Sequence, residues 1–306
     1  MTALRGTYTV LITPFTADGG AVDVPALKTL VNWQIEQGIH GLIPLGSTGE
    51  FLSMTPEERA QVIEICVGEA AGRVPVLIGT GAEWTRDAVA HAREAERMGA
   101  DGIMVIPPFY STPTADELFE HYRRIGEAVS LPVMIYNNPA TANVDLTPPI
   151  VARLSEIDNM LYIKESTLEV TRVRDIIELC GDRMTVFAGI LGYESFWLGA
   201  QGWVAVCSNL IPRDSARLFE LVADHGDKDQ ALALYKKMLP IVRWVGGHRY
   251  VAATKAGLGM MGLPVGAPRA PRLPLPAGDT EALRADLAAY GLIDSLGASP
   301  AGGAGR

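Results

Sequence analysis

The sequence contains little cysteine, and the few cysteines lie far apart. Cys66, Cys180 and Cys207 are the three in 306 residues, and none forms a Cys-x-x-Cys pair. Cysteines without paired spacing argue against a disulfide framework and against a thiolate zinc site. The sequence therefore predicts a protein of a reducing compartment, and we expect it in the cytoplasm.

Histidine and positive charge are also scarce. The five histidines show no paired ligand spacing, so we expect no metal site and assign each histidine to the surface or to packing. Lysine and arginine number 26 against 35 acidic residues, which gives a formal net charge of −9. This balance provides no positive surface for nucleic acid, and we expect no nucleic-acid partner.

Long hydrophobic runs are absent from the sequence. No apolar run approaches the roughly 20 residues of a membrane-spanning helix, and residues 1–5 (MTALR) lack the apolar core of a signal peptide. We therefore expect no association with a membrane. Yet 48% of the 306 residues are hydrophobic and 20% are charged, so the chain can bury a large core.

Two short apolar runs each end abruptly in polar residues. Residues 131–139 read LPVMIYNNP, and residues 160–166 read MLYIKES. Short apolar runs bounded by turn residues are typical of strands that are buried on both faces of a parallel sheet. One helical segment separates the runs, which predicts neighbouring strands of a βαβ unit. Tyr136 and Lys164 would then lie side by side at one rim of the sheet.

A lysine beside a tyrosine at such a rim can support Schiff-base chemistry. Burial of Lys164 among apolar residues disfavours its charged form and lowers its pKa. A neutral amine can attack a ketone and form an imine, and Tyr136 can transfer the protons that this reaction needs. The alternative is that Lys164 ends its strand in water or pairs with Glu165 or Glu50, which is the commoner situation for a single lysine.

The rest of the chain alternates between strand and helix patterns. Eight strand–helix units fit a closed (β/α)8 TIM barrel, an α/β fold. The alternative is an open doubly wound sheet, but the predicted strands are alike in length and no G-x-G-x-x-G motif opens the first helix. The predicted strands cover residues 8–13, 41–45, 74–78, 102–106, 131–136, 160–164, 184–187 and 202–206, and predicted helices include 25–37, 85–98, 114–129 and 167–179.

The chain changes character near residue 226. We predict that residues 1–225 form the barrel with its active site. Residues 226–306 are predicted to form a helical C-terminal extension that covers the barrel or a partner subunit. It contains helices over 230–245, 249–257 and 280–290, a proline-rich linker over 264–276, and a disordered end over 299–306.

Active sites of such barrels lie where strands end and the following loops begin. The segment 46–49 (GSTG) follows the second strand, and its hydroxyls and backbone N–H groups can bind a carboxylate. Taken alone, it could also be an ordinary turn, and Tyr110 could be a packing residue. We expect Glu50 to make a structural hydrogen bond or salt bridge, and Trp197 and Trp203 to lie in the core. The polar residues that would converge on one mouth are Ser47, Thr48, Tyr110, Tyr136, Lys164, Gly189, Ser208 and Asn209.

Together these motifs resemble those of the dihydrodipicolinate synthase / N-acetylneuraminate lyase family of Schiff-base aldolases. The resemblance implies a lyase, either an aldolase or a dehydratase, that acts on pyruvate or a small 2-oxo acid through a lysine imine. It also implies a homotetramer built as a dimer of dimers, with no metal or organic cofactor. The matching segments are 46–50 (GSTGE), 107–110 (PPFY), 136–139 (YNNP) and 163–166 (IKES), with Gly189, Ser208 and Asn209, over roughly the first 225 residues.

The resemblance implies a role for each matching residue. Lys164 would form the imine, Tyr136 would transfer protons at the substrate, and Ser47 would relay protons to Tyr136. Tyr110 would complete this relay from across a subunit interface. The residues implied in substrate binding are Ser47, Thr48, Gly189, Thr141 and Val206.

Two departures from the family bear on the substrate. Thr141 stands where dihydrodipicolinate synthases carry an arginine that binds the carboxylate of the aldehyde substrate, and losing such a partner costs several kcal/mol. Ile190 and Leu191 stand where sialic-acid lyases carry acidic residues that hold sugar hydroxyls. The sequence thus favours a smaller or less polar 2-oxo acid. Condensation of pyruvate with aspartate semialdehyde in lysine biosynthesis stays as the alternative.

Two other classes of protein also stay open. A non-catalytic protein that binds a 2-oxo acid would have no need of both Lys164 and Tyr136. A metal-dependent barrel enzyme would need clustered carboxylates or histidines at the strand ends, and the sequence shows no such cluster there. Both are therefore weaker hypotheses than the imine-forming enzyme.

Overall fold

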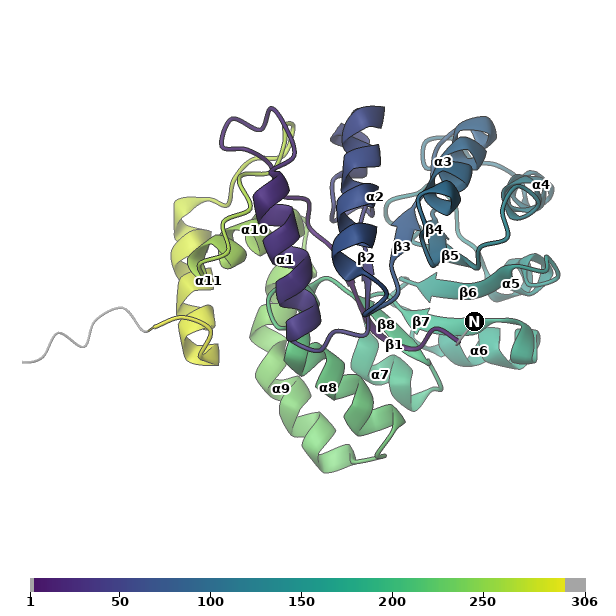
Figure 1. Ribbon diagram of the computed structural model, residues 1–306. Helices are drawn as coiled ribbons and strands as arrows, with labels where there is room; N and C mark the ends of the chain where they lie inside the picture. The colour runs from purple at the N-terminus through teal and green to yellow at the C-terminus, as the bar shows by residue number, and fades with distance from the viewer. Residues whose placement is uncertain (1–2, 295–306) are drawn as a thin grey trace, which may run out of the picture.

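The computed structural model describes residues 3–294, and within them eight parallel strands form one sheet (Figure 1). The strand order is β2-β1-β8-β7-β6-β5-β4-β3, and a parallel bridge from Leu42 to Val76 closes the ring between its two ends. The predicted (β/α)8 barrel is therefore confirmed. The strands are β1 (Gly6–Val10), β2 (Gly41–Ile43), β3 (Leu77–Gly79), β4 (Gly102–Val105), β5 (Val133–Asn137), β6 (Met160–Glu165), β7 (Thr185–Ala188) and β8 (Gly202–Ala205).

Helices follow the strands and form the outer ring of the barrel (Figure 1). Thr55 and Thr114 each begin a helix with a reciprocal capping box, in which a glutamate three residues later bonds back to the cap. The helix predicted from residue 167 begins later, because the Glu165 carboxylate accepts a 2.7 Å hydrogen bond from the Thr167 N–H and shapes a turn there. The helices are α1 (Val24–Glu36), α2 (Pro56–Ala70), α3 (Thr85–Arg97), α4 (Ala115–Gly126), α5 (Pro148–Leu154), α6 (Thr171–Cys180), α7 (Gly192–Trp197) and α8 (Pro212–Ala223).

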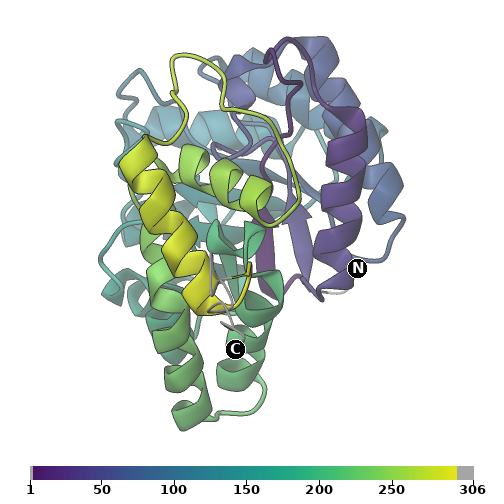
Figure 2. The same ribbon diagram turned by 90° about the vertical axis from the view of Figure 1, so that its left-hand side faces the viewer.

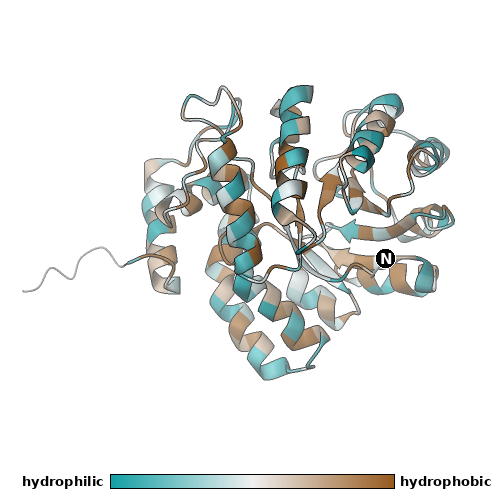
Figure 3. Cartoon of the chain, viewed as in Figure 1, coloured by the Kyte–Doolittle hydropathy of each residue, from teal (hydrophilic) through white to brown (hydrophobic). Residues whose placement is uncertain are grey.

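Two hydrophobic layers hold the barrel together. Tyr8, Tyr162 and Phe187 fill the interior, where edge-to-face contacts place the ring centres of Tyr8 and Tyr162 at 5.5 and 5.9 Å from that of Phe187. A second and larger cluster lies between the strands and the surrounding helices. In Figure 3, brown colouring is present on several strands, whereas the helices of the outer ring carry both brown and teal segments. The prediction that Trp203 is buried is confirmed, but Trp197 ends the short α7 and is 42% exposed, so its predicted place in the core is wrong.

Three further helices follow the barrel: α9 (Lys228–Val245), α10 (Tyr250–Met260) and α11 (Ala277–Tyr290). α10 and α11 lie on the side toward which β6 points, and Figure 2 shows them from that side, in front of the barrel. The linker between them is tied to the loop after β1, because the Phe15 N–H donates to the Val265 carbonyl at 3.1 Å. The linker and the helices α10 and α11 therefore lie on the side of the barrel where the strands end, whereas α9 packs beside α8. The division of the chain at residue 226 stays a prediction, and residues 299–306 lie outside the described residues.

Residues 3–294 contain neither a membrane-spanning helix nor a cluster of metal-binding side chains. No helix between residues 3 and 294 has the length and apolar character needed to cross a membrane. The same part of the chain holds no group of three or more histidine, cysteine or acidic side chains that could bind a metal ion.

Candidate active site

Lys164 and Tyr136 lie side by side at the ends of neighbouring strands, as the βαβ pattern predicts. β5 and β6 are parallel, and the two residues are direct partners in the register of the pair. The Lys164 Nζ atom lies 3.9 Å from the centre of the Tyr136 ring. The amine and the phenol are thus brought together by the backbone of the barrel rather than by a flexible loop.

The Lys164 amine is buried and its pKa is strongly perturbed. The residue is 5% exposed, and burial lowers its pKa to about 7. Neither Glu165 nor Glu50, the two acidic partners considered for Lys164, forms a salt bridge with it. Glu165 accepts a hydrogen bond from Asn137 Nδ2 at 2.9 Å, and Glu50 pairs with Lys255 at 2.9 Å. The alternatives that Lys164 ends its strand in water or pairs with these acids are therefore wrong.

The Tyr136 hydroxyl is held in place by a neighbouring side chain. It accepts a hydrogen bond from Asn138 Nδ2 at 2.9 Å. Burial raises the pKa of Tyr136, while Asn138 and the nearby Ser166 act in the opposite direction. The phenol therefore keeps its proton at neutral pH and can donate it to a reacting group.

Gly189 packs against the same site from the end of β7. A Cβ atom at this position would lie 1.7 Å from Ser166 Oγ, 2.8 Å from Ser166 Cβ and 3.0 Å from the Glu165 carbonyl oxygen, so any side chain would force these groups to shift. The Gly189 N–H donates to the Glu165 carbonyl at 2.7 Å. Glycine is thus required here because the loops after β6 and β7 approach each other closely.

The loop after β2 brings two hydroxyl residues to the same region. Ser47 is half-buried and Thr48 is buried. Ser47 and Tyr136 both line one small cavity, whose other walls include Gly46 and Gly81. The loop and Tyr136 therefore face a common space, as the convergence of strand ends predicts.

Glu50 fixes this loop to the C-terminal extension. It is buried, and its backbone adopts the left-handed conformation with φ of 58°. Its Oε1 atom lies 2.9 Å from Lys255 Nζ on α10, and its Oε2 atom accepts a 2.9 Å hydrogen bond from the Arg269 N–H. The predicted structural role of Glu50 is confirmed. Sequence reasoning missed both partners, since they lie about 200 residues away along the chain with no local pattern to link them.

Tyr110 lies in the loop after β4 and is directed away from the core of its own chain. Its side chain is 84% exposed, so the alternative of a packing tyrosine is wrong within this chain. The loop backbone is nevertheless fixed. Glu83 accepts hydrogen bonds from the N–H groups of Phe109, Tyr110 and Ser111, each at 2.9 Å. Asn143 Nδ2 donates to the Tyr110 carbonyl at 3.1 Å, and neither Glu83 nor Asn143 belongs to a motif that would have revealed it.

The other candidate residues occupy different positions around the mouth. Thr141 is exposed in the loop after β5, where its hydroxyl donates to the Asn138 carbonyl at 3.3 Å. Val206 is half-buried and packs against the interior cluster. Asn209 is buried and ties β8 to β1, donating to the Val10 carbonyl at 2.9 Å, and Ser208 donates to the Ala205 carbonyl at 2.9 Å. Ser208 and Asn209 therefore support the barrel.

A sequence model described as the Dihydrodipicolinate synthetase family matches residues 3–290. The chain belongs to this family. A 4-hydroxy-tetrahydrodipicolinate synthase from Syntrophobacter fumaroxidans is 38% identical over 292 residues, covering 94% of this chain and 99% of the relative. A protein of the same name from Nitrobacter hamburgensis is 36% identical over 301 residues, covering 96% of this chain and 99% of the relative.

Solved structures of dihydrodipicolinate synthases share the fold. The chloride-inhibited enzyme from Acinetobacter baumannii, complexed with pyruvate, superimposes with a TM-score of 0.92 at 35% identity, over 95% of this chain and 100% of that chain. A variant described as the first monomeric dihydrodipicolinate synthase gives a TM-score of 0.90 at 28% identity, over 95% of this chain and 98% of that chain. Members of the family are class I aldolases and lyases that act through a lysine Schiff base, and this chain is an enzyme of that type.

Removing the Glu83 carboxylate is expected to loosen the Tyr110 loop of this family member. Three N–H groups would lose one charged acceptor in Glu83→Ala, so amide hydrogens of residues 109–111 should exchange roughly tenfold faster or more in hydrogen–deuterium exchange. Burial opposes the charge of Glu83, but hydrogen bonds from Ser111 and from the loop backbone outweigh it, and its pKa is lowered. The stabilisation of the Tyr110 loop by the Glu83 carboxylate is therefore fully present at pH values above the ordinary pKa of glutamate. It is lost as the pH falls through the lowered pKa of Glu83.

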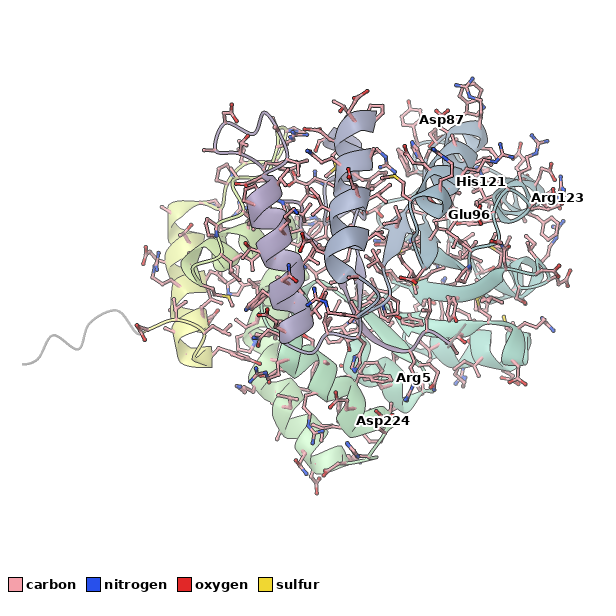
Figure 4. The ribbon with its side chains drawn as sticks, viewed as in Figure 1. Arg5, Asp87, Glu96, His121, Arg123 and Asp224 are labelled. Atoms are coloured by element: carbon pink, nitrogen blue, oxygen red, sulfur yellow. The ribbon has the colours of Figure 1, made fainter. Side chains whose placement is uncertain are left out.

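Glu96 on α3 provides the matched control (Figure 4). Its carboxylate also accepts a backbone hydrogen bond, from the Ser130 N–H at 2.7 Å, but in another loop. Glu96→Ala should leave exchange at residues 109–111 unchanged. If the amide hydrogens of residues 109–111 exchange at the same rate in Glu83→Ala and in Glu96→Ala, Glu83 does not hold the Tyr110 loop.

Proposed function

We propose that this enzyme acts on pyruvate or a small 2-oxo acid by forming an imine with Lys164. The observation that carries the proposal is the buried Lys164 amine, with a pKa of about 7, beside the Tyr136 ring. Such an amine is largely neutral just above pH 7 and can attack the C2 carbonyl of the acid. The pyruvate complex of the Acinetobacter baumannii relative supports this choice of substrate.

Tyr136 would move the protons that imine formation requires. Addition of the Lys164 amine to C2 gives a carbinolamine, and the Tyr136 hydroxyl would protonate its departing hydroxyl, which leaves as water. The resulting phenolate would regain a proton from the carbinolamine nitrogen. Asn138 Nδ2, at 2.9 Å, would stabilise the transient phenolate. When its nitrogen is protonated again, the imine acts as an electron sink at C2, which serves aldol cleavage, condensation and β-elimination alike.

Ser47 and Tyr110 would complete a proton relay to Tyr136. Ser47 lines the same small cavity as Tyr136, which supports a direct exchange between them. Tyr110 is 84% exposed on a fixed loop, which supports a role in the site of a neighbouring subunit. We accordingly propose a homotetramer. We also place the enzyme in the cytoplasm and expect it to need no cofactor beyond the Lys164 imine.

The substrate carboxylate would lie at the loop after β2. Ser47 and Thr48 would donate their hydroxyls, and the backbone of the same loop would add N–H groups. Gly189 would contribute a backbone contact from the other side of the site. Val206 and Thr141 would line the route along which the rest of the substrate extends.

The second candidate function is that of a 4-hydroxy-tetrahydrodipicolinate synthase, which condenses pyruvate with aspartate semialdehyde in lysine biosynthesis. The curated relatives carry this name at 36–38% identity over nearly their full length, which favours it. Thr141 opposes it, because a neutral and exposed hydroxyl replaces a charged partner. A coupled assay with pyruvate and aspartate semialdehyde discriminates between the two. Turnover close to that of authentic synthases would establish this second function.

Reductive trapping with cyanoborohydride tests the imine and its dependence on pH. We expect pyruvate to give one adduct, located on Lys164 by peptide mapping. The initial trapping rate should rise with pH and reach half of its maximum near pH 7, because only the neutral amine attacks and its pKa is about 7. An ordinary lysine is less than about 0.1% neutral at that pH. A midpoint near the ordinary lysine pKa would contradict the buried-amine mechanism.

A further inference from the structure

The linker between α10 and α11 runs past the loops that follow β1 and β2 at the mouth of the barrel (Figure 2). Arg269 provides the anchor. Its N–H donates to Glu50 Oε2 at 2.9 Å, and its guanidinium donates to the carbonyls of Gly19 at 2.9 Å and Ser53 at 2.7 Å. It also pairs with Glu58 on α2. The linker backbone is thus fixed beside the loop that carries Ser47 and Thr48.

Arg272 follows this anchor by three residues and brings a positive charge to the mouth. Its side chain is 41% exposed, and the one carboxylate of the described chain that pairs with it is Glu50, at 4.0 Å. Both oxygens of Glu50 already have nearer partners, Lys255 at 2.9 Å and the Arg269 N–H at 2.9 Å. The guanidinium of Arg272 is therefore left with the capacity to bind a further anion.

Tyr250, the first residue of α10, is influenced electrostatically by both Arg272 and Tyr136. Burial raises the pKa of Tyr250, the nearby Arg272 lowers it, and the electrostatic influence of Tyr136 raises it again. Arg272, Tyr136 and Glu50 all act on the Tyr250 hydroxyl, so this hydroxyl belongs to the same cluster of groups at the mouth as Arg272 and Glu50. A ligand that extends from Lys164 toward the C-terminal linker would approach Arg272, which the linker places 4.0 Å from Glu50 at the mouth.

We propose that Arg272, assisted by Tyr250, binds a second carboxylate at the end of the substrate farthest from the imine carbon. The substrate class is then a 2-oxo acid with a distal carboxylate, or a donor–acceptor pair whose acceptor carries one. The inference rests on the proposed imine function of Lys164. In this proposal Arg272 of the C-terminal linker provides the positive charge for the distal carboxylate, which the neutral hydroxyl of Thr141 cannot provide.

Two acids of equal chain length test the proposal: 2-oxopentanedioate, with a distal carboxylate, and 2-oxopentanoate, which ends in a methyl group. We expect the unmodified enzyme to trap the dicarboxylate on Lys164 at least about tenfold faster, as befits a charged hydrogen bond. The ratio of the two rates should fall close to one in Arg272→Gln and lie between these values in Arg272→Lys. Because the two trapping rates are compared within the same variant, any effect of the substitution on the reactivity of the Lys164 amine cancels in their ratio.

Arg217→Gln is the matched control, because Arg217 on α8 is similarly exposed at 44% and pairs with Glu220 at 3.3 Å. This variant removes the same charge and should keep the preference for the dicarboxylate. Equal rates for the two acids in the unmodified enzyme, or an unchanged ratio in Arg272→Gln, would overturn the assignment. Calorimetric titration with the same acids requires no imine. If pyruvate forms no adduct, the imine proposal fails, and the titration still decides whether Arg272 selects the distal carboxylate.

Discussion

Lys164→Ala is expected to abolish reductive trapping of pyruvate and to lower turnover by roughly three orders of magnitude or more, as removal of a catalytic nucleophile does. The physical reason is that no other amine replaces the one beside Tyr136. Lys255, the other buried lysine at the mouth, is held by Glu50 at 2.9 Å and donates to the Ala267 carbonyl at 3.1 Å. Intact mass after trapping and steady-state turnover on the best 2-oxo acid measure the two effects.

Two further variants separate the chemistry of Lys164 from its packing. Lys164→Met keeps most of the buried volume, so loss of trapping in this variant is not a consequence of a cavity. Tyr136→Phe keeps the ring that packs against the amine but removes the hydroxyl, and it should slow trapping by roughly 10²–10⁴-fold without moving the adduct. Lys237→Ala, which removes an exposed lysine paired with Asp214, should trap normally. Full turnover by Lys164→Ala would rule out the imine mechanism.

The central pair of the site could be predicted from sequence because its geometry is local. Tyr136 and Lys164 lie on consecutive parallel strands, and the apolar runs that precede them determine where each strand ends. The strand-end rule for (β/α)8 barrels then brought Ser47, Thr48 and Gly189 to the same mouth without any knowledge of distant contacts. The burial that lowers the pKa of Lys164 also follows from its apolar neighbours along β6.

The supporting groups could not be predicted, because they act through backbone atoms or over long distances in the sequence. Glu83 serves three N–H groups of another loop, and such a role requires only a carboxylate in the right place. The linker over 264–276 has no periodic pattern, so neither the anchor at Arg269 nor the position of Arg272 could be inferred. Trp197 was misplaced because its hydrophobic neighbours suggested burial, whereas the short α7 ends at this residue and leaves it 42% exposed.

Breaking the buried Glu50–Lys255 pair is expected to have the largest effect on stability. Both side chains are at most 2% exposed, so Glu50→Gln would leave the Lys255 charge buried without its partner. Loss of one member of a buried pair typically costs about 3–5 kcal/mol in the free energy of unfolding. Urea unfolding monitored by circular dichroism measures the loss. The double variant Glu50→Gln/Lys255→Met should recover part of it, since no unpaired charge then stays buried.

The Arg5–Asp224 pair, labelled in Figure 4, is the matched control. It has a short separation of 2.6 Å, but its side chains are 51% and 36% exposed. Asp224→Asn should therefore cost less than about 1 kcal/mol. Equal losses in Asp224→Asn and Glu50→Gln would mean that burial does not strengthen the Glu50 pair.

The same variant shows whether the C-terminal extension positions the substrate loop. Glu50 follows Thr48 by two residues, and its partners Lys255 and Arg269 both belong to the extension. At temperatures where Glu50→Gln stays folded, the loop with Ser47 and Thr48 should bind the substrate carboxylate less well. KM should then rise more than kcat falls, because the Lys164 amine and the Tyr136 hydroxyl are left in place. An unchanged KM with lowered stability would restrict Glu50 to holding the fold, and the loop would then owe its shape to the barrel alone.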